Sequence, residues 1–243
     1  MNDKVEIGSL KIDKVDYLDL DNEITNAISN KGKLFISYAN AHTVNRTYKN
    51  KNLADKLNSF DIIHPDGIGI YIASKILYGS NGFKKRISGS DFYPILAELS
   101  VKNNFRVFFF GHNEKTLNLI NKNYPLLSIA GLQKGYNFDS QLVINSINTV
   151  SADILIVGLG FSKQEEWILK HKDELNCNVC ISVGDGIKVF AGTKIRGPKF
   201  MRTLGLEWFV RFLTNPLKYF NRYIIGNPLF LLRILLIKIS NFK

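Results

Sequence analysis

An aspartate in the segment His64-Pro65-Asp66-Gly67 is the residue of this chain best placed to do chemistry. Pro-Asp-Gly is an ordinary turn sequence, because proline fixes φ, aspartate bonds the turn backbone and glycine accepts a positive φ. Here, however, the turn directly follows an apolar run, and a helix-forming segment, residues 68–78, begins at once after it. A carboxylate at such a junction is suitably placed to act as a general base, so we expect Asp66 to be catalytic.

Polar and glycine residues follow other apolar runs in the same way. Asn40 opens a helix-forming segment, and capping that helix is its ordinary role. Gly111 ends another run, and its missing side chain lets the backbone approach a phosphate closely. Gly158 and Lys163 flank a turn into a further helix, which is typical of a diphosphate cradle. Because this turn lacks the G-x-G-x-x-G spacing and follows a late strand, a nicotinamide-dependent oxidoreductase is disfavoured.

Two short motifs have ordinary structural explanations. Asp19-Leu20-Asp21 has the D-x-D spacing of metal-dependent glycosyltransferases, but it stands where a first helix begins, and aspartate is common there. Cys177 and Cys180 have C-x-x-C spacing within an apolar run, which predicts buried thiols. The four histidines are scattered along the chain and show no metal-ligand spacing. We therefore predict neither a metal site nor a cofactor.

The elements that would position these residues alternate along the chain. Apolar runs predict strands at 34–39, 60–63, 106–111, 153–160 and 177–184, and helical patterns lie around 43–58, 68–78, 91–103, 113–122, 141–151 and 164–175. Short, nearly continuous apolar strands separated by helices indicate a parallel sheet covered on both faces. We therefore predict a Rossmann-like α/β fold with a mostly parallel sheet, preceded by a hairpin turning at Gly8-Ser9. Ligands bind such sheets beyond the carboxyl ends of the strands.

The charge of the chain is concentrated near its C-terminus. The 243 residues carry a formal net charge of +11, with 45% hydrophobic and 22% charged residues, which is ordinary globular composition. Residues 194–243 hold ten basic residues and one acid, Glu207. A basic segment favours a polyanion, either nucleic acid or an anionic membrane surface. We divide the chain into a catalytic domain, residues 1–194, and a basic, apolar C-terminal appendage, residues 195–243.

The appendage is too apolar for a nucleic-acid arm and too interrupted for a clean membrane span. Apolar residues crowd 206–213, 223–225 and 229–239, yet the longest unbroken apolar run is four residues. A span needs about twenty predominantly apolar residues. Residues 229–243 also do not separate into two clean faces on a helical wheel. We expect the appendage to bind a membrane surface by inserting aromatic and aliphatic side chains. The alternative is that its helices pack on the body or on a partner subunit.

Taken together, these segments resemble the WecG/TagA/CpsF family of glycosyltransferases, glycosyltransferase family 26. The matching pieces are Asn40-Ala41, HPDGIGI at 64–70, RISGSDFYPIL at 86–96, VFFFGHNEKT at 107–116, GLQKGYNF at 131–138, DILIVGLGFSKQEEWI at 153–168, SVGDGIKVFAGTKIRGPKF at 182–200 and GLEWFVRFLTNPLKYFNRY at 205–223. Any one piece is weak, but the ordered set, which runs through nearly the whole chain, is highly specific.

The resemblance implies an inverting enzyme of bacterial cell-surface polysaccharide synthesis. Such enzymes transfer a sugar from a UDP-sugar to an undecaprenyl-diphosphate-linked sugar, without a required metal, at the cytoplasmic face of the cell membrane. Members transfer N-acetylmannosamine, its uronic acid or glucose, and the donor sugar of this chain stays open. The resemblance thus implies a peripheral protein on the inner membrane face, with an anionic membrane surface but no nucleic acid as partner. The oligomeric state is left open, with a homo-oligomer among the alternatives.

The resemblance also assigns roles to individual residues. Asp66 becomes the general base. The family's motif positions expected to contact the donor or the acceptor are Asn40, Arg86 and Gln164, and those expected to meet the acceptor diphosphate are Arg211, Lys218 and Arg222. We also expect substrate contacts from Gly67, Gly111, Gly158, Lys163, Glu165 and Arg196. Lys218 stands where the family has an arginine, so it keeps the charge but loses the bidentate fork.

A non-catalytic nucleotide-sugar or nucleic-acid binding module with a basic tail is the alternative from another functional class. Steep salt dependence of DNA binding would favour it. The apolar content of the appendage and the presence of both Asp66 and Gln164 argue against it.

Overall fold

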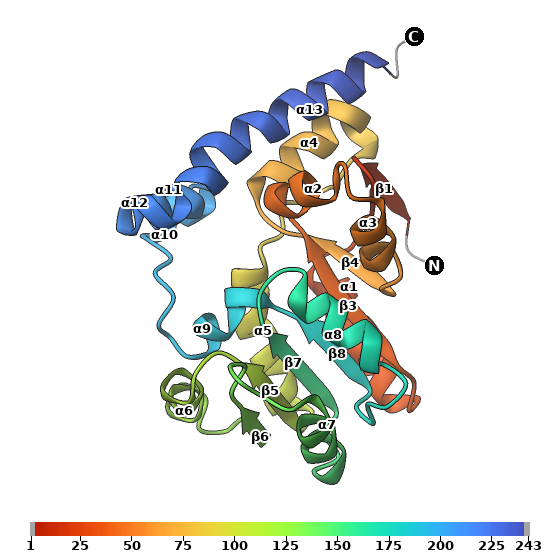
Figure 1. The fold of residues 1–243 in the computed structure, drawn as a ribbon, viewed down its shortest axis with the longest axis vertical. Helices are drawn as coiled ribbons and strands as arrows, with labels where there is room; N and C mark the ends of the chain where they lie inside the picture. Colours follow the sequence, from red (N-terminus) through yellow and green to blue (C-terminus); the bar gives the residue numbers. More distant parts are fainter. Residues whose placement is uncertain (1–2, 241–243) are drawn as a thin grey trace.

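A six-stranded parallel sheet forms the centre of the computed structural model, which describes residues 3–240 (Figure 1). Its strands are β3 Leu34–Ala39, β4 Ile62–Pro65, β5 Val107–Gly111, β6 Ile129–Gln133, β7 Ile154–Gly158 and β8 Val179–Ser182, in the spatial order β4-β3-β8-β7-β5-β6. Neighbouring strands all pair in parallel. The carboxyl ends of the strands therefore meet at one edge of the sheet, as predicted.

Successive residues of each strand enter two apolar layers, one on each face of the sheet. In β5, Phe108 and Phe110 belong to one layer and Phe109 to the other. One face is covered by α1 Tyr17–Ser29, α5 Gly89–Lys102, α6 Glu114–Asn123 and α9 Ile187–Phe190, and the other by α3 Lys51–Asn58, α7 Ser140–Thr149 and α8 Lys163–His171. Burial on both faces explains why the apolar runs do not alternate with polar residues. The predicted Rossmann-like architecture is confirmed.

Two predicted elements have the observed bounds, eight differ by one to four residues at an end, and one is divided. Strand 34–39 and helix α4, Ile68–Tyr78, coincide with the predictions. The predicted helix 43–58 is two helices, α2 Ala41–Thr47 and α3, because the Asn50 side chain accepts from the backbone N–H of Leu53 and starts α3. Strand β6 was not predicted, because it is an edge strand of half-buried residues and lacks a fully apolar run.

The predicted N-terminal hairpin is confirmed and is fastened to the sheet beside β4. Strands β1 Lys4–Ile7 and β2 Leu10–Asp13 pair antiparallel across a turn at Gly8 and Ser9, where Gly8 has φ 65°. The buried Asp13 carboxylate accepts the Ile63 N–H at 2.9 Å and pairs with Lys4 at 3.2 Å. The hairpin thus covers the edge strand that carries Asp66 at its end.

The appendage is docked on the body. It forms α10 Lys199–Thr203, α11 Glu207–Thr214, α12 Pro216–Phe220, a π-helical turn Asn221–Ile225 and α13 Gly226–Ser240, and Figure 1 shows α13 running along α2 and α4. Phe230 and Ile234 are buried in the core, at 1% and 0% exposure. Arg233 lies 4.3 Å from the Tyr48 ring and donates to Asn45 Oδ1 at 2.8 Å. Residues 241–243 of the appendage lie outside the described residues.

The outward face of α13 is also apolar. Leu232, Leu235 and Leu236 are 54%, 49% and 52% exposed. The helix therefore has no polar face, which explains the mixed helical wheel of this segment. The continuous helical stretch Pro216–Ser240 is long and apolar enough to cross a membrane. The interruptions in its apolar runs had argued against a span. The contacts of Phe230, Ile234 and Arg233 with the body instead favour a helix lying along the protein.

A pair of neighbouring substitutions tests this docking. Ile234→Ala should lower the free energy of unfolding by about 2–5 kcal/mol, because it empties a fully buried site. Leu235→Ala, on the outward face, should change it by less than about 0.5 kcal/mol. Urea unfolding followed by circular dichroism measures both values. Equal, small effects of the two substitutions would show that α13 does not pack on the body in solution.

Candidate active site

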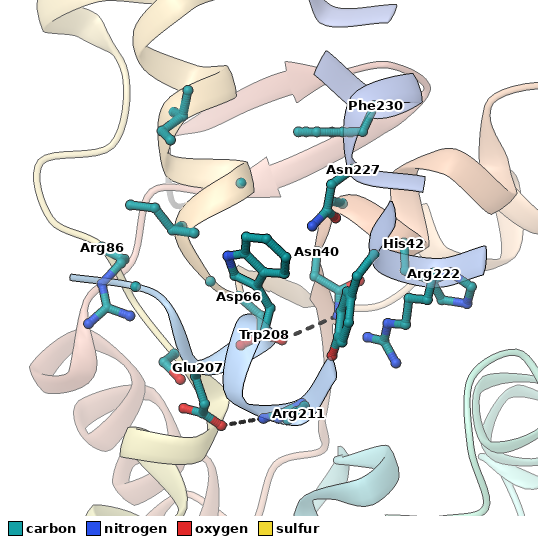
Figure 2. A pocket seen from close by; sticks show the side chains of 18 of the residues that line it. Asn40, His42, Asp66, Arg86, Glu207, Trp208, Arg211, Arg222, Asn227 and Phe230 are labelled. Carbon is teal, nitrogen blue, oxygen red and sulfur yellow. Dashed lines mark hydrogen bonds and ion pairs between the residues drawn. The ribbon is translucent and has the colours of Figure 1, made fainter. Parts of the chain in front are cut away.

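A cavity of about 280 Å³ opens where the carboxyl ends of β3 and β4 meet the appendage (Figure 2). Its polar lining includes Asn40 and Asp66 from the strand ends, Arg86 from the segment before α5, and Glu207, Arg211 and Arg222 from the appendage. Segments more than 100 residues apart in the chain thus build one site. Six of the predicted site residues line this cavity, namely Asn40, Asp66, Gly67, Arg86, Arg211 and Arg222.

The Asp66 carboxylate is held by two hydrogen-bond donors. The Gly89 N–H donates to Oδ1 at 2.9 Å, and Asn40 Nδ2 donates to Oδ2 at 3.2 Å. Burial alone would raise the pKa of Asp66, but the Gly89 hydrogen bond, the nearby His64, Asn40 and Lys194 together hold it below its ordinary value of 3.8. Asp66 is therefore ionised at neutral pH, which is the state that a general base needs.

Asn40 ties Asp66 to the start of α2. Its Oδ1 accepts the Thr43 N–H at 3.1 Å, which confirms that Asn40 caps this helix. Because the oxygen is engaged by the helix, the amide nitrogen faces Asp66. Asn40 thus fixes the position of the carboxylate and also favours its charged form.

The substitution Asn40→Asp should make kcat/KM of the transfer reaction fall at mildly acidic pH. Aspartate is also a good helix cap, but it would put a second carboxylate beside Asp66 and raise the pKa of the pair. Since a protonated base is inactive, kcat/KM of the wild type should stay level down to about pH 5. In the variant, kcat/KM should decrease as the pH is lowered from about 7 to about 5. A pH profile of transfer measures this, and superimposable profiles would contradict the role given to Asn40.

Arginines from the body and the appendage surround the carboxylate in Figure 2. Arg86 Nη2 donates to the backbone oxygen of Arg202 at 2.9 Å and so links the body to α10. Burial alone would lower the pKa of Arg211, but its ion pair with Glu207 raises that pKa above the ordinary value. Arg222 lies beside the Tyr223 ring, 5.6 Å from its centroid. The cavity thus combines an ionised base with permanent positive charges.

Arg196, also predicted as a site residue, supports the cavity without lining it. Its guanidinium pairs with Asp91 near the start of α5 and lies 3.7 Å from Glu207 Oε2. Because Glu207 also pairs with Arg211, this carboxylate joins two arginines of the appendage. Arg196 therefore fastens the first turn of α5, and with it the Gly89 N–H that holds Asp66, to α11.

Gln164 and Glu165 are fully buried and lie outside the cavity lining. Gln164 Oε1 accepts the Gly184 N–H at 2.9 Å, and its Nε2 donates to Glu165 Oε1 at 2.7 Å. Ser37 of β3 donates to the same carboxylate at 3.4 Å, and burial raises the pKa of Glu165. The pair thus connects α8 to β3 and to the end of β8, and its predicted contact with substrate stays a prediction.

The glycine-rich strand ends are closely packed. Gly111 and Gly158 stand opposite each other in β5 and β7, and a β-carbon on Gly158 would collide with Ile187. Lys163 is exposed at the start of α8. Gly111, Gly158 and Lys163 are all outside the lining of the Asp66 cavity, so their contact with a diphosphate also stays a prediction. Gly67 does line it and has φ 89°, with open space where a β-carbon would project.

Sequence reasoning missed part of the lining. Trp208 lies in front of Asp66 in Figure 2 and packs against Tyr223 with ring centroids 5.8 Å apart. His42 also lines the cavity, and burial together with Arg222 lowers its pKa to about 4, so its ring is neutral. Glu207 could have been found from the sequence, because it is the single acidic residue in 194–243, beside ten basic residues. Within residues 3–240 no three histidine, cysteine or acidic residues gather as they would around a metal ion.

Comparison with known proteins agrees with this geometry. The profile of the Glycosyl transferase WecG/TagA/CpsF family matches residues 5–243. The chain belongs to this family. The matched range includes Asp66 and the appendage alike, so both halves of the cavity lie within the WecG/TagA/CpsF match. The chain is accordingly a member of a glycosyltransferase family.

Curated relatives are similar to this WecG/TagA/CpsF member along most of their length. An N-acetylglucosaminyldiphosphoundecaprenol N-acetyl-beta-D-mannosaminyltransferase of Bacillus spizizenii is 31% identical over 221 residues, 86% of this chain and 84% of the relative. The enzyme of that name from Bacillus subtilis is 31% identical, over 84% of this chain and 79% of the relative. An enzyme of the same name from Staphylococcus aureus is 29% identical, over 87% of this chain and 85% of the relative.

Proposed function

We propose that this protein is an inverting glycosyltransferase that moves a sugar from a UDP-sugar to an undecaprenyl-diphosphate-linked sugar. The observation that carries the proposal is the ionised Asp66 carboxylate in a cavity that Arg86, Arg211 and Arg222 also line. The names of the relatives describe a mannosaminyl transfer to N-acetylglucosaminyldiphosphoundecaprenol, which supports this class of acceptor. N-acetylmannosamine, its uronic acid, glucose and related hexoses are the candidate donor sugars.

In the proposed reaction Asp66 accepts the proton of the acceptor hydroxyl. The hydroxyl oxygen attacks the anomeric carbon, and the bond from that carbon to the UDP oxygen breaks with its electron pair going to UDP. Arg211 and Arg222 offer permanent positive charge to the acceptor diphosphate. Backbone N–H groups near Gly111 and Gly158, together with Lys163, offset the negative charge that develops on the departing UDP. Attack opposite to the leaving group inverts the anomeric configuration. A positioned base of this kind contributes about 10²–10⁴ in rate.

The proposed acceptor also accounts for the apolar side of the cavity. Phe230, Leu231 and Ile72 line it, and Leu231 and Ile72 are 40% and 41% exposed, next to the outward face of α13. A lipid-linked sugar leaves the bilayer only by its diphosphate and sugar, so the cavity must lie close to the membrane. The exposed leucines of α13 can enter the interface, and each basic residue near anionic lipid contributes about 1 kcal/mol. We therefore place the protein at the inner face of the cell membrane as a peripheral protein.

A transfer assay tests this function. The full-length protein is incubated with each of several UDP-sugars and with lipid-diphosphate-linked N-acetylglucosamine, and the lipid product is analysed by mass and linkage. We expect one UDP-sugar to add a single hexose-type residue to the acceptor. Hydrolysis of every donor without a lipid-linked disaccharide would contradict the proposal.

A further inference from the structure

Part of the Asp66 cavity is lined by polar side chains that carry no charge. His42 contributes to this uncharged lining from α2, Trp208 from α11 and Asn227 from α13. All three are half-buried, and none forms a side-chain hydrogen bond with another residue of the range 3–240. In Figure 2 Asn227 extends toward Trp208, which lies in front of Asp66. The uncharged lining therefore offers hydrogen-bonding groups to a ligand beside the base.

These groups suit hydroxyl and amide groups of a ligand. Burial, together with the positive charges of Arg222 and Arg46, lowers the pKa of His42 to about 4. The ring is therefore neutral and carries one N–H donor and one acceptor nitrogen. The Asn227 amide also has both kinds of group, and the Trp208 indole has one donor. A sugar needs both donors and acceptors, because each of its hydroxyl groups both donates and accepts hydrogen bonds.

The Trp208 ring is held in place by a row of aromatic rings. Its centroid lies 5.8 Å from that of the buried Tyr223, and Tyr223 stacks on Tyr219 at 5.3 Å with an interplanar angle of 22°. Glu207, the residue before Trp208, is fixed by its ion pair with Arg211. A flat apolar surface held in this way fits the C–H face of a sugar ring and loses little conformational freedom on binding.

The surroundings of the uncharged lining indicate which sugar it holds. Phe230 and Leu231 line the cavity next to the outward face of α13, where a lipid chain would lie. Arg211 and Arg222 supply the charge for a diphosphate. Asp66 takes the proton of the acceptor hydroxyl, so the sugar that bears this hydroxyl lies next to Asp66. The lipid chain, the diphosphate and the sugar of one acceptor thus each match a part of the same cavity.

We infer that His42, Trp208 and Asn227 bind the sugar ring of the acceptor, with Trp208 against its apolar face. The inference rests on the proposed function. His42 and Asn227 form hydrogen bonds with the hydroxyl and acetamido groups of this ring. Lys218, which the resemblance assigned to the acceptor diphosphate, lines a separate cavity of about 230 Å³ and does not line the Asp66 cavity. The uncharged lining makes the protein select a lipid diphosphate that already carries a sugar.

Calorimetric titration of the full-length protein with two short-chain, water-soluble compounds tests this selectivity at saturating UDP. One is a prenyl diphosphate that carries N-acetylglucosamine, and the other is the same prenyl diphosphate without the sugar. The wild type should bind the sugar-bearing compound about tenfold to a hundredfold more tightly. Trp208→Leu should raise the Kd of this compound about tenfold, and Asn227→Leu or His42→Phe about threefold to tenfold. The Kd of the sugar-free compound should change by less than about twofold in every variant.

Two further variants make the result specific to the Trp208 ring. Trp208→Phe keeps an aromatic surface and should raise the Kd of the sugar-bearing compound by less than about threefold. Phe220→Leu removes a ring of α12 that is 48% exposed and lines neither cavity, and it should leave both Kd values unchanged. Melting curves establish that each variant is folded before its Kd is compared.

Either of two results would overturn the inference. One is equal affinity of the wild type for the sugar-bearing and the sugar-free compound. The other is a Trp208→Leu variant that retains the wild-type preference for the sugar. Because binding requires no turnover, the proposed function fails separately if the wild type prefers the sugar-bearing compound through these residues but transfers no sugar to it.

Discussion

Asp66→Asn should lower the turnover of sugar transfer by about 10²–10⁴ while changing the affinity for UDP by less than about twofold. Asparagine has nearly the same shape and its side-chain oxygen can still accept the Gly89 N–H, which is 2.9 Å from Asp66 Oδ1. It cannot, however, accept the proton of the acceptor hydroxyl. The loss should therefore appear in kcat, with little change in donor binding.

Steady-state kinetics and UDP titration on the same protein preparation measure these two quantities. Asp55→Asn, an exposed change of the same chemistry on α3, is the matched control and should leave both unchanged. Near-normal turnover in Asp66→Asn would remove Asp66 from the role of base. A large loss of UDP affinity with normal turnover at saturation would make it a binding residue instead.

Replacing Leu232, Leu235 and Leu236 by glutamine should detach the protein from membranes. These side chains are about half exposed on the outward face of α13, so their loss removes apolar surface without opening the core. Each should contribute about 1 kcal/mol of insertion, and the three together should lower the partition coefficient onto anionic vesicles about a hundredfold. Transfer to a vesicle-bound acceptor should fall with it, because the lipid acceptor stays in the bilayer.

Vesicle sedimentation and two transfer assays check this expectation. Transfer to a short-chain, water-soluble acceptor should stay normal in the triple variant, because the Asp66 cavity is unchanged. Leu126→Gln with Leu142→Gln alters two leucines of the body that are 80% and 69% exposed, and this control should sediment like the wild type. Unchanged sedimentation of the triple variant would contradict the proposed orientation of α13 toward the membrane.

The sequence was sufficient to place Asp66 and Asn40 at the strand ends that build one half of the cavity. Asp66 and Asn40 each follow a strand, and parallel pairing of β3 with β4 alone brings their side chains to 3.2 Å. The pattern was clear there because strands buried on both faces read as continuous apolar runs. It failed for β6, whose edge position leaves its residues half-buried.

In the other half of the cavity, the resemblance predicted Arg211 and Arg222, but the remaining lining could not be predicted, because it depends on how the appendage packs. Trp208 and Glu207 reach the strand ends only through the docking of α11 and α13, which no local pattern specifies. Helix α13 is apolar on its buried and its exposed face, so its sequence does not show which face meets the body. Packing on the body is observed for one face of this helix, and membrane binding is proposed for the other.

The anomeric configuration of the product tests most directly whether Asp66 catalyses a single displacement. The lipid-linked disaccharide formed from an α-linked UDP-sugar is isolated, and the coupling and chemical shift of its new anomeric carbon are measured by nuclear magnetic resonance. One base and one displacement predict a β-linked product. An α-linked product would require two displacements or a front-side mechanism, and would contradict the role of Asp66 as the base of an inverting transfer.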